Sequence, residues 1–108
     1  MRQLQGTNVI GTLLSPVLIE KEAIETLYFP KQEVLFSKEE IAAREDQLHR
    51  ANVLGNRSKC NTKVSLYFED IEGLKKVETT IWGVTNQSVI LKKNITIPIH
   101  RIVKINII

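Results

Sequence analysis

The stretch of sequence that decides the fold reads Lys63-Val64-Ser65-Leu66-Tyr67-Phe68-Glu69-Asp70. In it, Val64, Leu66 and Phe68 alternate with polar or amphipathic residues. Because successive side chains of a β-strand point to opposite faces, this pattern predicts a strand with one face buried and the other toward water. It follows a polar, turn-rich linker at residues 55–62, where the side-chain period of the chain changes.

A second and longer strand is expected over residues 74–85, after a turn at Asp70-Ile71-Glu72-Gly73. Gly83 lies near its end, where we expect a bulge or a sharp bend. Alternation along this strand separates inward from outward side chains. The inward set is Val77, Thr79 and Ile81, and the outward set is Glu78, Thr80 and Trp82.

Three short strands complete the C-terminal region. Residues 88–92 and 95–99 form two of them, joined by a tight hairpin at Lys93-Asn94. Pro98 has no N–H to donate, so we expect it at an edge or at the end of pairing. After a one-turn bridge at His100-Arg101, the last strand follows. Its inward residues are expected to be Val103, Ile105 and Ile107.

Five short strands joined by tight turns, one of them long and bent, predict a small closed or nearly closed β-barrel over residues 63–108. A barrel of this size is marginal alone, and a helix that covers it would enlarge the core. We therefore expect an α+β protein, mainly β. An N-terminal arm (residues 1–19), a helical segment (residues 20–55) and the barrel should form one folding unit.

The best-defined helix start lies at Ser37-Lys38-Glu39-Glu40, which has the form of a capping box. In such a box the serine hydroxyl accepts from the amide three residues on, and the glutamate reaches back to the serine amide. Phe36 before the box and Ile41 after it suit a hydrophobic staple. These features predict a helix that begins at Lys38.

The helix is expected to cover residues 38–54, because Gly55 suits the left-handed residue after a last turn. A second, short helix is expected over residues 20–29, before Pro30. The longer helix carries acid-first pairs on its exposed side and a narrow apolar stripe for a surface. The pairs are Glu40 with Arg44, Glu45 with His49 and Asp46 with Arg50, and the stripe is Ile41, Leu48, Ala51 and Leu54.

The composition is that of a soluble globular protein, since 43% of the 108 residues are hydrophobic and 25% are charged. The single cysteine, Cys60, has no partner for an intramolecular disulfide, which indicates a reducing compartment. The apolar run Val9–Ile19 is too short and too interrupted for a membrane span, and no signal-peptide cleavage site follows it. We therefore expect a cytoplasmic protein that does not bind membranes.

Charge is distributed unevenly along the chain. Residues 1–55 hold six Lys and Arg against eight Asp and Glu, whereas residues 56–108 hold nine against four. A basic second half suits an anionic partner, and the same charge also serves solubility.

The C-terminal region resembles the small barrels of the Sm-like and SH3-like class in its order of strand, turn, long bent strand and hairpin, and in its ending Ile-Pro-Ile-His-Arg-Ile-Val-Lys-Ile (residues 97–105). It is most similar to the bacterial Rho-inhibitor type, where a phrase of the form Ile-x-hydrophobic-x-Arg-Ile closes the sheet. The segment Val77-Glu78-Thr79-Thr80-Ile81-Trp82 is also similar to a strand in a family of small uncharacterised bacterial proteins. The resemblance covers under half of the chain. It implies a protein that binds RNA, DNA or other proteins and is not an enzyme.

The residue pattern contains no catalytic or metal-binding motif. The chain has two histidines, His49 and His100, and one cysteine, and none of them lies within a turn of another. The glycines are isolated, so no phosphate-binding loop is formed. We expect no enzymatic activity, no cofactor, no metal and no small-molecule substrate.

The first functional hypothesis is a protein-binding adaptor or regulator. The apolar residues of segments 9–19 and 34–36 exceed what the helix over 38–54 can cover. An exposed apolar patch of this kind implies a protein partner or a homo-oligomer.

The alternative hypothesis is binding of RNA or single-stranded nucleic acid through the basic barrel surface. Cationic groups beside exposed aromatic rings can hold a phosphate backbone and stack on bases. The same lysines also protect sheet edges from aggregation, and we expect Trp82 to lie under the helix over 38–54, where it would not reach a base. The candidate nucleic-acid residues are Lys75, Lys76, Lys92, Lys93, Arg101, Lys104, Tyr67 and Trp82.

Overall fold

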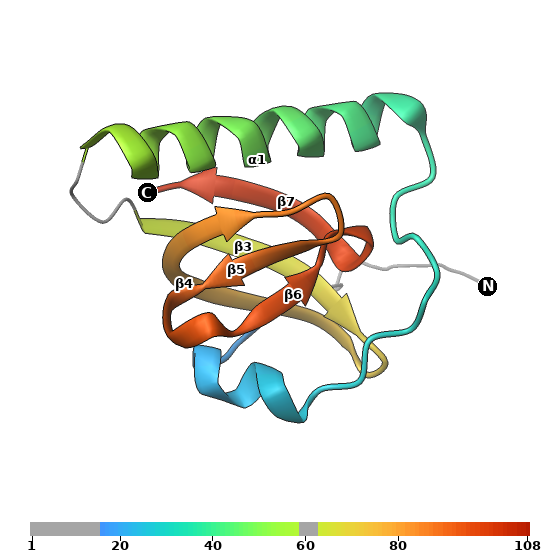
Figure 1. Ribbon diagram of the computed structural model, residues 1–108. Helices are drawn as coiled ribbons and strands as arrows, with labels where there is room; N and C mark the ends of the chain where they lie inside the picture. The colour runs from blue at the N-terminus through green and yellow to red at the C-terminus, as the bar shows by residue number, and fades with distance from the viewer. Residues whose placement is uncertain (1–15, 59–62) are drawn as a thin grey trace.

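The computed structural model describes residues 16–58 and 63–108 of the chain (Figure 1). It shows an α+β protein, mainly β, with one sheet and one main helix. Within the described ranges, no helix has the length and apolar character needed to cross a membrane. The strands are β2 (Val17–Leu18), β3 (Lys63–Asp70), β4 (Gly73–Val84), β5 (Ser88–Leu91), β6 (Thr96–Pro98) and β7 (Ile102–Ile107); the helices are α1 (Lys38–Ser58) and the 3-10 helices η1 (Lys21–Thr26), η2 (Lys92–Asn94) and η3 (Ile99–Arg101).

The strands pair in the order β6-β5-β4-β3-β7, and β2 adds to β4 as a sixth strand. All neighbours on this path are antiparallel, whereas β2 runs parallel to β4. Among the residues described, no pairing joins β6 to β7, so the sheet is open. The expectation of a five-stranded, closed or nearly closed barrel is corrected accordingly: the sheet has six strands and does not close.

The alternation in β3 builds the centre of the core. Val64, Leu66 and Phe68 are at most 1% exposed. Every later strand and two helices contribute further apolar side chains, so the sheet and its cover share one core. These residues are Val77, Ile81, Val89, Leu91, Ile95, Ile97, Ile102 and Ile105 from the C-terminal region and Ile24, Leu48 and Ala51 from η1 and α1.

β4 is long enough to serve two parts of the sheet. Its first eight residues pair with β3, and its last residues pair with β5. The register shifts between Ile81 and Gly83, which confirms the irregularity expected at this glycine. The bend carries β5 and β6 away from the plane of β3 and β7 (Figure 1).

β7 departs from the strict alternation expected for it. Its register against β3 shifts between Tyr67 and Phe68. The extra residue is Val103, so Ile102 takes its place in the core at 0% exposed, and the expectation that Val103 points inward is wrong. Ile105 points inward as expected and is 3% exposed. Ile107 pairs with the buried Val64 on the same face, but near the end of the strand it is 42% exposed.

α1 begins as expected and ends later than expected. The amide of Glu40 donates to Ser37 Oγ at 3.1 Å, and the amide of Ser37 donates to Glu40 Oε1 at 3.4 Å, which confirms the capping box. Phe36 is 97% exposed, so the expected hydrophobic staple is wrong. The helix continues through Gly55 to Ser58 rather than ending at residue 54. A glycine inside a helix costs only about 1 kcal/mol relative to alanine, which does not stop it.

Side chains of α1 bind the free edge of β7. Gln47 Oε1 accepts a hydrogen bond from the amide of Ile105 at 2.8 Å, and Arg44 Nη1 donates to the carbonyl of Ile102 at 3.0 Å. α1 thus lies along the β7 side of the sheet (Figure 1). It satisfies main-chain groups that an edge strand would otherwise leave unpaired.

The N-terminal region pairs with β4 along the edge that faces away from β3. Val17 and Leu18 pair with Lys75 and Lys76, so the end of the expected arm is a strand. Residues 1–15 of that arm, and the side chain of Leu54, lie outside the described part of the chain. The short helix expected over residues 20–29 is present as η1, a 3-10 helix.

Candidate functional site

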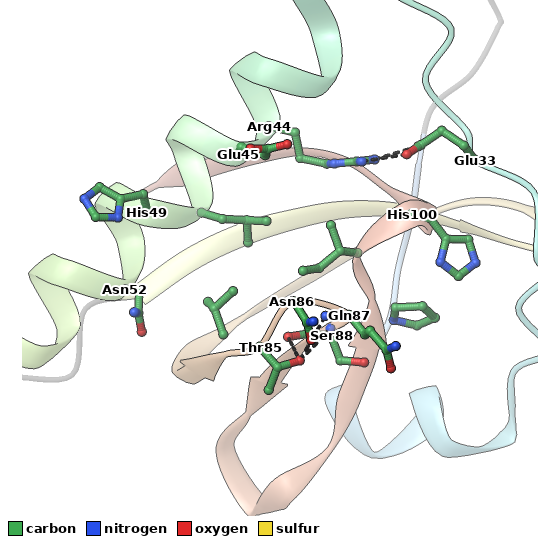
Figure 2. Close-up of a pocket in the computed structure, with 14 residues that line it drawn as sticks. Glu33, Arg44, Glu45, His49, Asn52, Thr85, Asn86, Gln87, Ser88 and His100 are labelled. Atoms are coloured by element: carbon green, nitrogen blue, oxygen red, sulfur yellow. Dashed lines mark hydrogen bonds and ion pairs between the residues drawn. The ribbon is translucent and has the colours of Figure 1, made fainter. Parts of the chain in front are cut away.

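A cleft of about 990 Å³ lies between α1 and the end of the sheet where β4 turns into β5 (Figure 2). Its walls come from α1, from the β4–β5 turn and from the junction of β6 with η3, which are distant from one another in sequence. The apolar lining residues are Leu48, Val84, Pro98 and Ile99, and the polar ones are Glu33, Arg44, Glu45, His49, Asn52, Thr85, Asn86, Gln87, Ser88 and His100.

α1 provides one wall because four lining residues recur every three or four positions along it. Glu45, Leu48, His49 and Asn52 therefore share one face of the helix. Leu48 is 4% exposed and belongs to the core, whereas Glu45 and His49 are exposed at the rim. The wall is thus apolar at its base and polar at its mouth.

The opposite wall is a tight turn with a fixed main chain. Thr85 Oγ1 accepts from the amides of Gln87 and Ser88 at 3.1 and 2.9 Å, and the amide of Thr85 donates to the Ser88 carbonyl at 2.8 Å. These bonds hold the turn without using the side chains of Asn86 and Gln87, which are exposed. Two amide side chains are therefore presented to the cleft on a rigid support.

Arg44 lies at one end of the cleft and is itself buried. Its Nη1 and Nη2 donate to the two carboxylate oxygens of Glu33, each at 2.7 Å (Figure 2). The hydrogen bonds from Arg44 lower the pKa of Glu33, against the opposing effect of its partial burial. The expected exposed pair of Glu40 with Arg44 is therefore wrong, because Arg44 points inward to a carboxylate outside the helix.

His100 approaches the same end of the cleft from η3. Its Nε2 lies 3.1 Å from the carbonyl oxygen of Pro30. A carbonyl only accepts, so Nε2 carries a proton in this contact. In the neutral ring, Nδ1 is then left as an acceptor for a ligand.

The charges around the cleft largely cancel. Arg44 is neutralised by Glu33, which leaves the carboxylate of Glu45 at the rim. The other polar lining groups are hydroxyls, amides and the two imidazoles. Across residues 16–58 and 63–108, no group of three His, Cys, Asp or Glu is placed to hold a metal ion. The arrangement suits a ligand that is neutral, forms hydrogen bonds in both directions and carries apolar groups.

Two of the eight candidate nucleic-acid residues are internal. Lys75 Nζ donates to Asp70 Oδ1 at 2.8 Å, and its side chain is 11% exposed. Arg101 is 7% exposed and donates to the carbonyls of Glu69 and Gln32. We therefore correct the expectation for Lys75 and Arg101: their charges stabilise the β3–β4 turn and the loop before α1 and are not presented to a partner.

Three other candidates come together on the outer face of the sheet, away from the cleft. Tyr67 lies opposite Lys76 on one side and opposite Lys104 on the other. Trp82 is 52% exposed, so the expectation that α1 covers it is wrong. Lys92 and Lys93 lie apart from this group, in η2, where Lys93 Nζ is 3.3 Å from Glu22 Oε2.

The sequence does not predict the cleft itself. Its pattern places His49 in an exposed pair with Glu45 and His100 in the bridge before the last strand, and neither position indicates a shared cleft. Their approach depends on the bend in β4 and on the position of α1 along β7. One feature of the sequence could have indicated the cleft. Leu48 and His49 place an apolar and a polar side chain next to each other on the helix face that meets the sheet.

The comparisons with known proteins give no relative. The chain matches no protein-family model, no curated protein and no solved structure.

Proposed function

We propose that the protein is a non-enzymatic binding module, a protein-binding adaptor or regulator, which holds an extended segment of a partner protein in the cleft between α1 and the β4–β5 turn. The observation that carries this proposal is a cleft of about 990 Å³ with apolar residues in its lining and amide and imidazole side chains on facing walls. Ligand pockets span about 300–1,000 Å³, so this cleft is at the upper end of the range.

A peptide segment suits these walls better than other ligands. Each of its residues brings one donor and one acceptor, and amide side chains such as those of Asn52, Asn86 and Gln87 both donate and accept. An apolar side chain of the segment would cover Leu48 and Ile99. A polyanion fits poorly, because Glu45 repels it and the charge of Arg44 is already neutralised.

We also propose that the bent, incompletely closed sheet is related in architecture to the small barrels of the Sm-like and SH3-like class, of the bacterial Rho-inhibitor type, in a cytoplasmic protein. The bend of β4 and the one-turn helix η3 between β6 and β7 support this proposal. So does the sequence pattern of residues 97–105.

The probe for the cleft is a peptide. It is selected from a displayed random library by its binding to the immobilised full chain. The double variant His49→Ala with Asn86→Ala changes exposed residues on both walls and should weaken peptide binding about tenfold or more. The matched control, Arg50→Ala with Thr96→Ala, changes exposed residues of α1 and β6 outside the cleft and should leave the affinity unchanged.

Unchanged peptide affinity in the cleft variant would contradict the proposal. Sedimentation of the protein alone provides a second test, because it measures the oligomeric state. A dimer that dissociates in the cleft variant, and not in the control, would make a second copy of the chain the occupant in place of a partner protein.

A second candidate function is binding of RNA or single-stranded nucleic acid through the outer face of the sheet. It is favoured by one observation, the convergence of Lys76 and Lys104 on the ring of Tyr67. Phosphate contacts make such binding fall steeply with added salt. A mobility shift with single-stranded oligonucleotides at low salt, lost as salt is raised, would support it, and no shift at low salt would end it.

A further inference from the structure

Lys76, Tyr67 and Lys104 form one row across β4, β3 and β7. The ammonium nitrogens of Lys76 and Lys104 lie 5.5 and 4.8 Å from the centre of the tyrosine ring. Neighbouring strands are about 4.8 Å apart, so the two lysines converge on Tyr67 from opposite sides of β3.

This convergence brings two like charges to one ring. The negative faces of the ring attract each ammonium, but the two positive charges repel each other. The adjacent Tyr67 hydroxyl, and after it the Glu78 carboxylate, raises the pKa of Lys76. An anion above the row would be attracted by both lysines and would offset their repulsion.

Glu78 and Trp82 are exposed at alternate positions along β4 from Lys76. Glu78 Oε2 is 3.5 Å from Lys76 Nζ, so an internal carboxylate already competes for one of the two cations. Trp82, at 52% exposed, lies about 20 Å further along the strand, at about 3.3 Å per residue. The outer face thus offers a paired cationic point and a separate aromatic ring.

We infer that Lys76 and Lys104 hold a phosphate group of a single-stranded nucleic acid above Tyr67, and that Glu78 weakens this contact by competing for Lys76. The inference rests on the nucleic-acid candidate function and is independent of the cleft. A nucleic acid suits this face better than an acidic peptide. The exposed tryptophan can stack on a base of a nucleic acid, whereas a polyglutamate peptide has no ring on which it could stack.

The probe is an oligothymidylate of about ten nucleotides, within the usual site size of single-strand binders. Trp82 is the only tryptophan of the chain, so its fluorescence reports binding on this face. Lys104→Gln should weaken binding severalfold and make the slope of log affinity against log salt shallower by about 0.7, the value of one lost phosphate contact on a single strand. Glu78→Gln should strengthen binding, because it releases Lys76.

Lys38→Gln is the matched control, since it removes the same charge from an exposed lysine at the start of α1, outside the row. It should leave the salt slope unchanged. Equal effects of Lys38→Gln and Lys104→Gln, or no gain in Glu78→Gln, would overturn the site while oligonucleotide binding still supports the candidate function. Absence of binding by the unmodified chain, or equally tight binding of polyglutamate, would overturn the inference together with that function, and neither result bears on the cleft.

Discussion

Arg44 is the residue that joins three parts of the chain. From α1 it binds Glu33 in the loop before the helix and the carbonyl of Ile102 at the start of β7. Its side chain is 4% exposed, and its Nε is buried without a partner among the described residues. Loss of Glu33 would leave a buried charge without compensation, so this pair fixes α1 against the sheet.

The Glu33–Arg44 pair makes stability depend on pH. Because Arg44 lowers the pKa of Glu33 in the folded protein, the stability from this pair is present above the unfolded-state pKa and is lost as pH falls through the folded value. Glu33→Gln should lower the free energy of unfolding at neutral pH by about 1–3 kcal/mol, since Glu33 is partly exposed. The variant should also lose part of the acid sensitivity below about pH 4.3, which urea unfolding across pH measures.

Asp46→Asn is the control for this prediction. Asp46 and Arg50 form an ion pair at 2.8 Å, but both side chains are more than half exposed. Their loss should change the free energy of unfolding by no more than about 0.5 kcal/mol. Equal losses in Glu33→Gln and Asp46→Asn would show that Arg44 is not a buried anchor.

Ser37 and Phe36 are neighbours whose substitutions should affect stability unequally. Ser37→Ala removes the cap of α1 and should cost about 1 kcal/mol of stability. Phe36→Ala removes an exposed ring and should cost no more than about 0.5 kcal/mol. Thermal unfolding of both variants tests this, and a loss of about 3 kcal/mol or more in Phe36→Ala would indicate a covered side chain.

At this scale, the sequence predicted the local capping contacts but not the hydrophobic staple, because Phe36 is exposed. The capping box joins residues three positions apart, and both of its hydrogen bonds are present. The partner of Arg44 lies eleven residues away, outside the helix, and a nearer glutamate at Glu40 satisfied the same spacing rule. Local spacing alone does not distinguish these two carboxylates.

At the scale of elements, α1 and β7 depend on each other through Gln47. Gln47→Ala removes the acceptor of the Ile105 amide and should cost about 1–2 kcal/mol. The exchange of that amide with solvent should become faster. Gln47→Glu keeps an acceptor and should restore slow exchange, which hydrogen exchange followed by NMR can measure. Equal exchange of the Ile105 amide in all three proteins would show that α1 does not protect this edge.

The strands could be predicted to within one or two residues because their alternation is a local property. β3 covers the predicted residues 63–70. β4 covers residues 73–84, so both of its ends lie one residue before those of the predicted strand, 74–85. The bulge in β7 and the true end of α1 could not be predicted from the sequence, because both depend on tertiary packing. The extra strand β2, at the end of the expected arm, could not be predicted, since two residues carry no periodicity.

At the scale of the whole molecule, the cleft exists only because separate segments meet. The loop before α1, α1 itself, the β4–β5 turn and η3 each contribute lining residues. No single segment contains a binding motif. The sequence therefore led to the hypothesis of a binding module but did not indicate the cleft as its site. The basic residues could be found from sequence, and alternation places Lys75 on the inward face with Val77. It does not reveal that Lys75 binds Asp70, or that Arg101 of η3 turns inward to bind the carbonyls of Glu69 and Gln32.

A map of NMR amide shifts in the full chain, titrated with the library-selected peptide, tests the central claim most directly. The account predicts that the largest shifts fall on Leu48, His49 and Asn52 of α1 and on the turn Thr85–Ser88, while the row at Tyr67 is unaffected. Shifts confined to β3 and β7 around Tyr67 and Lys104, with none at the turn, would contradict it.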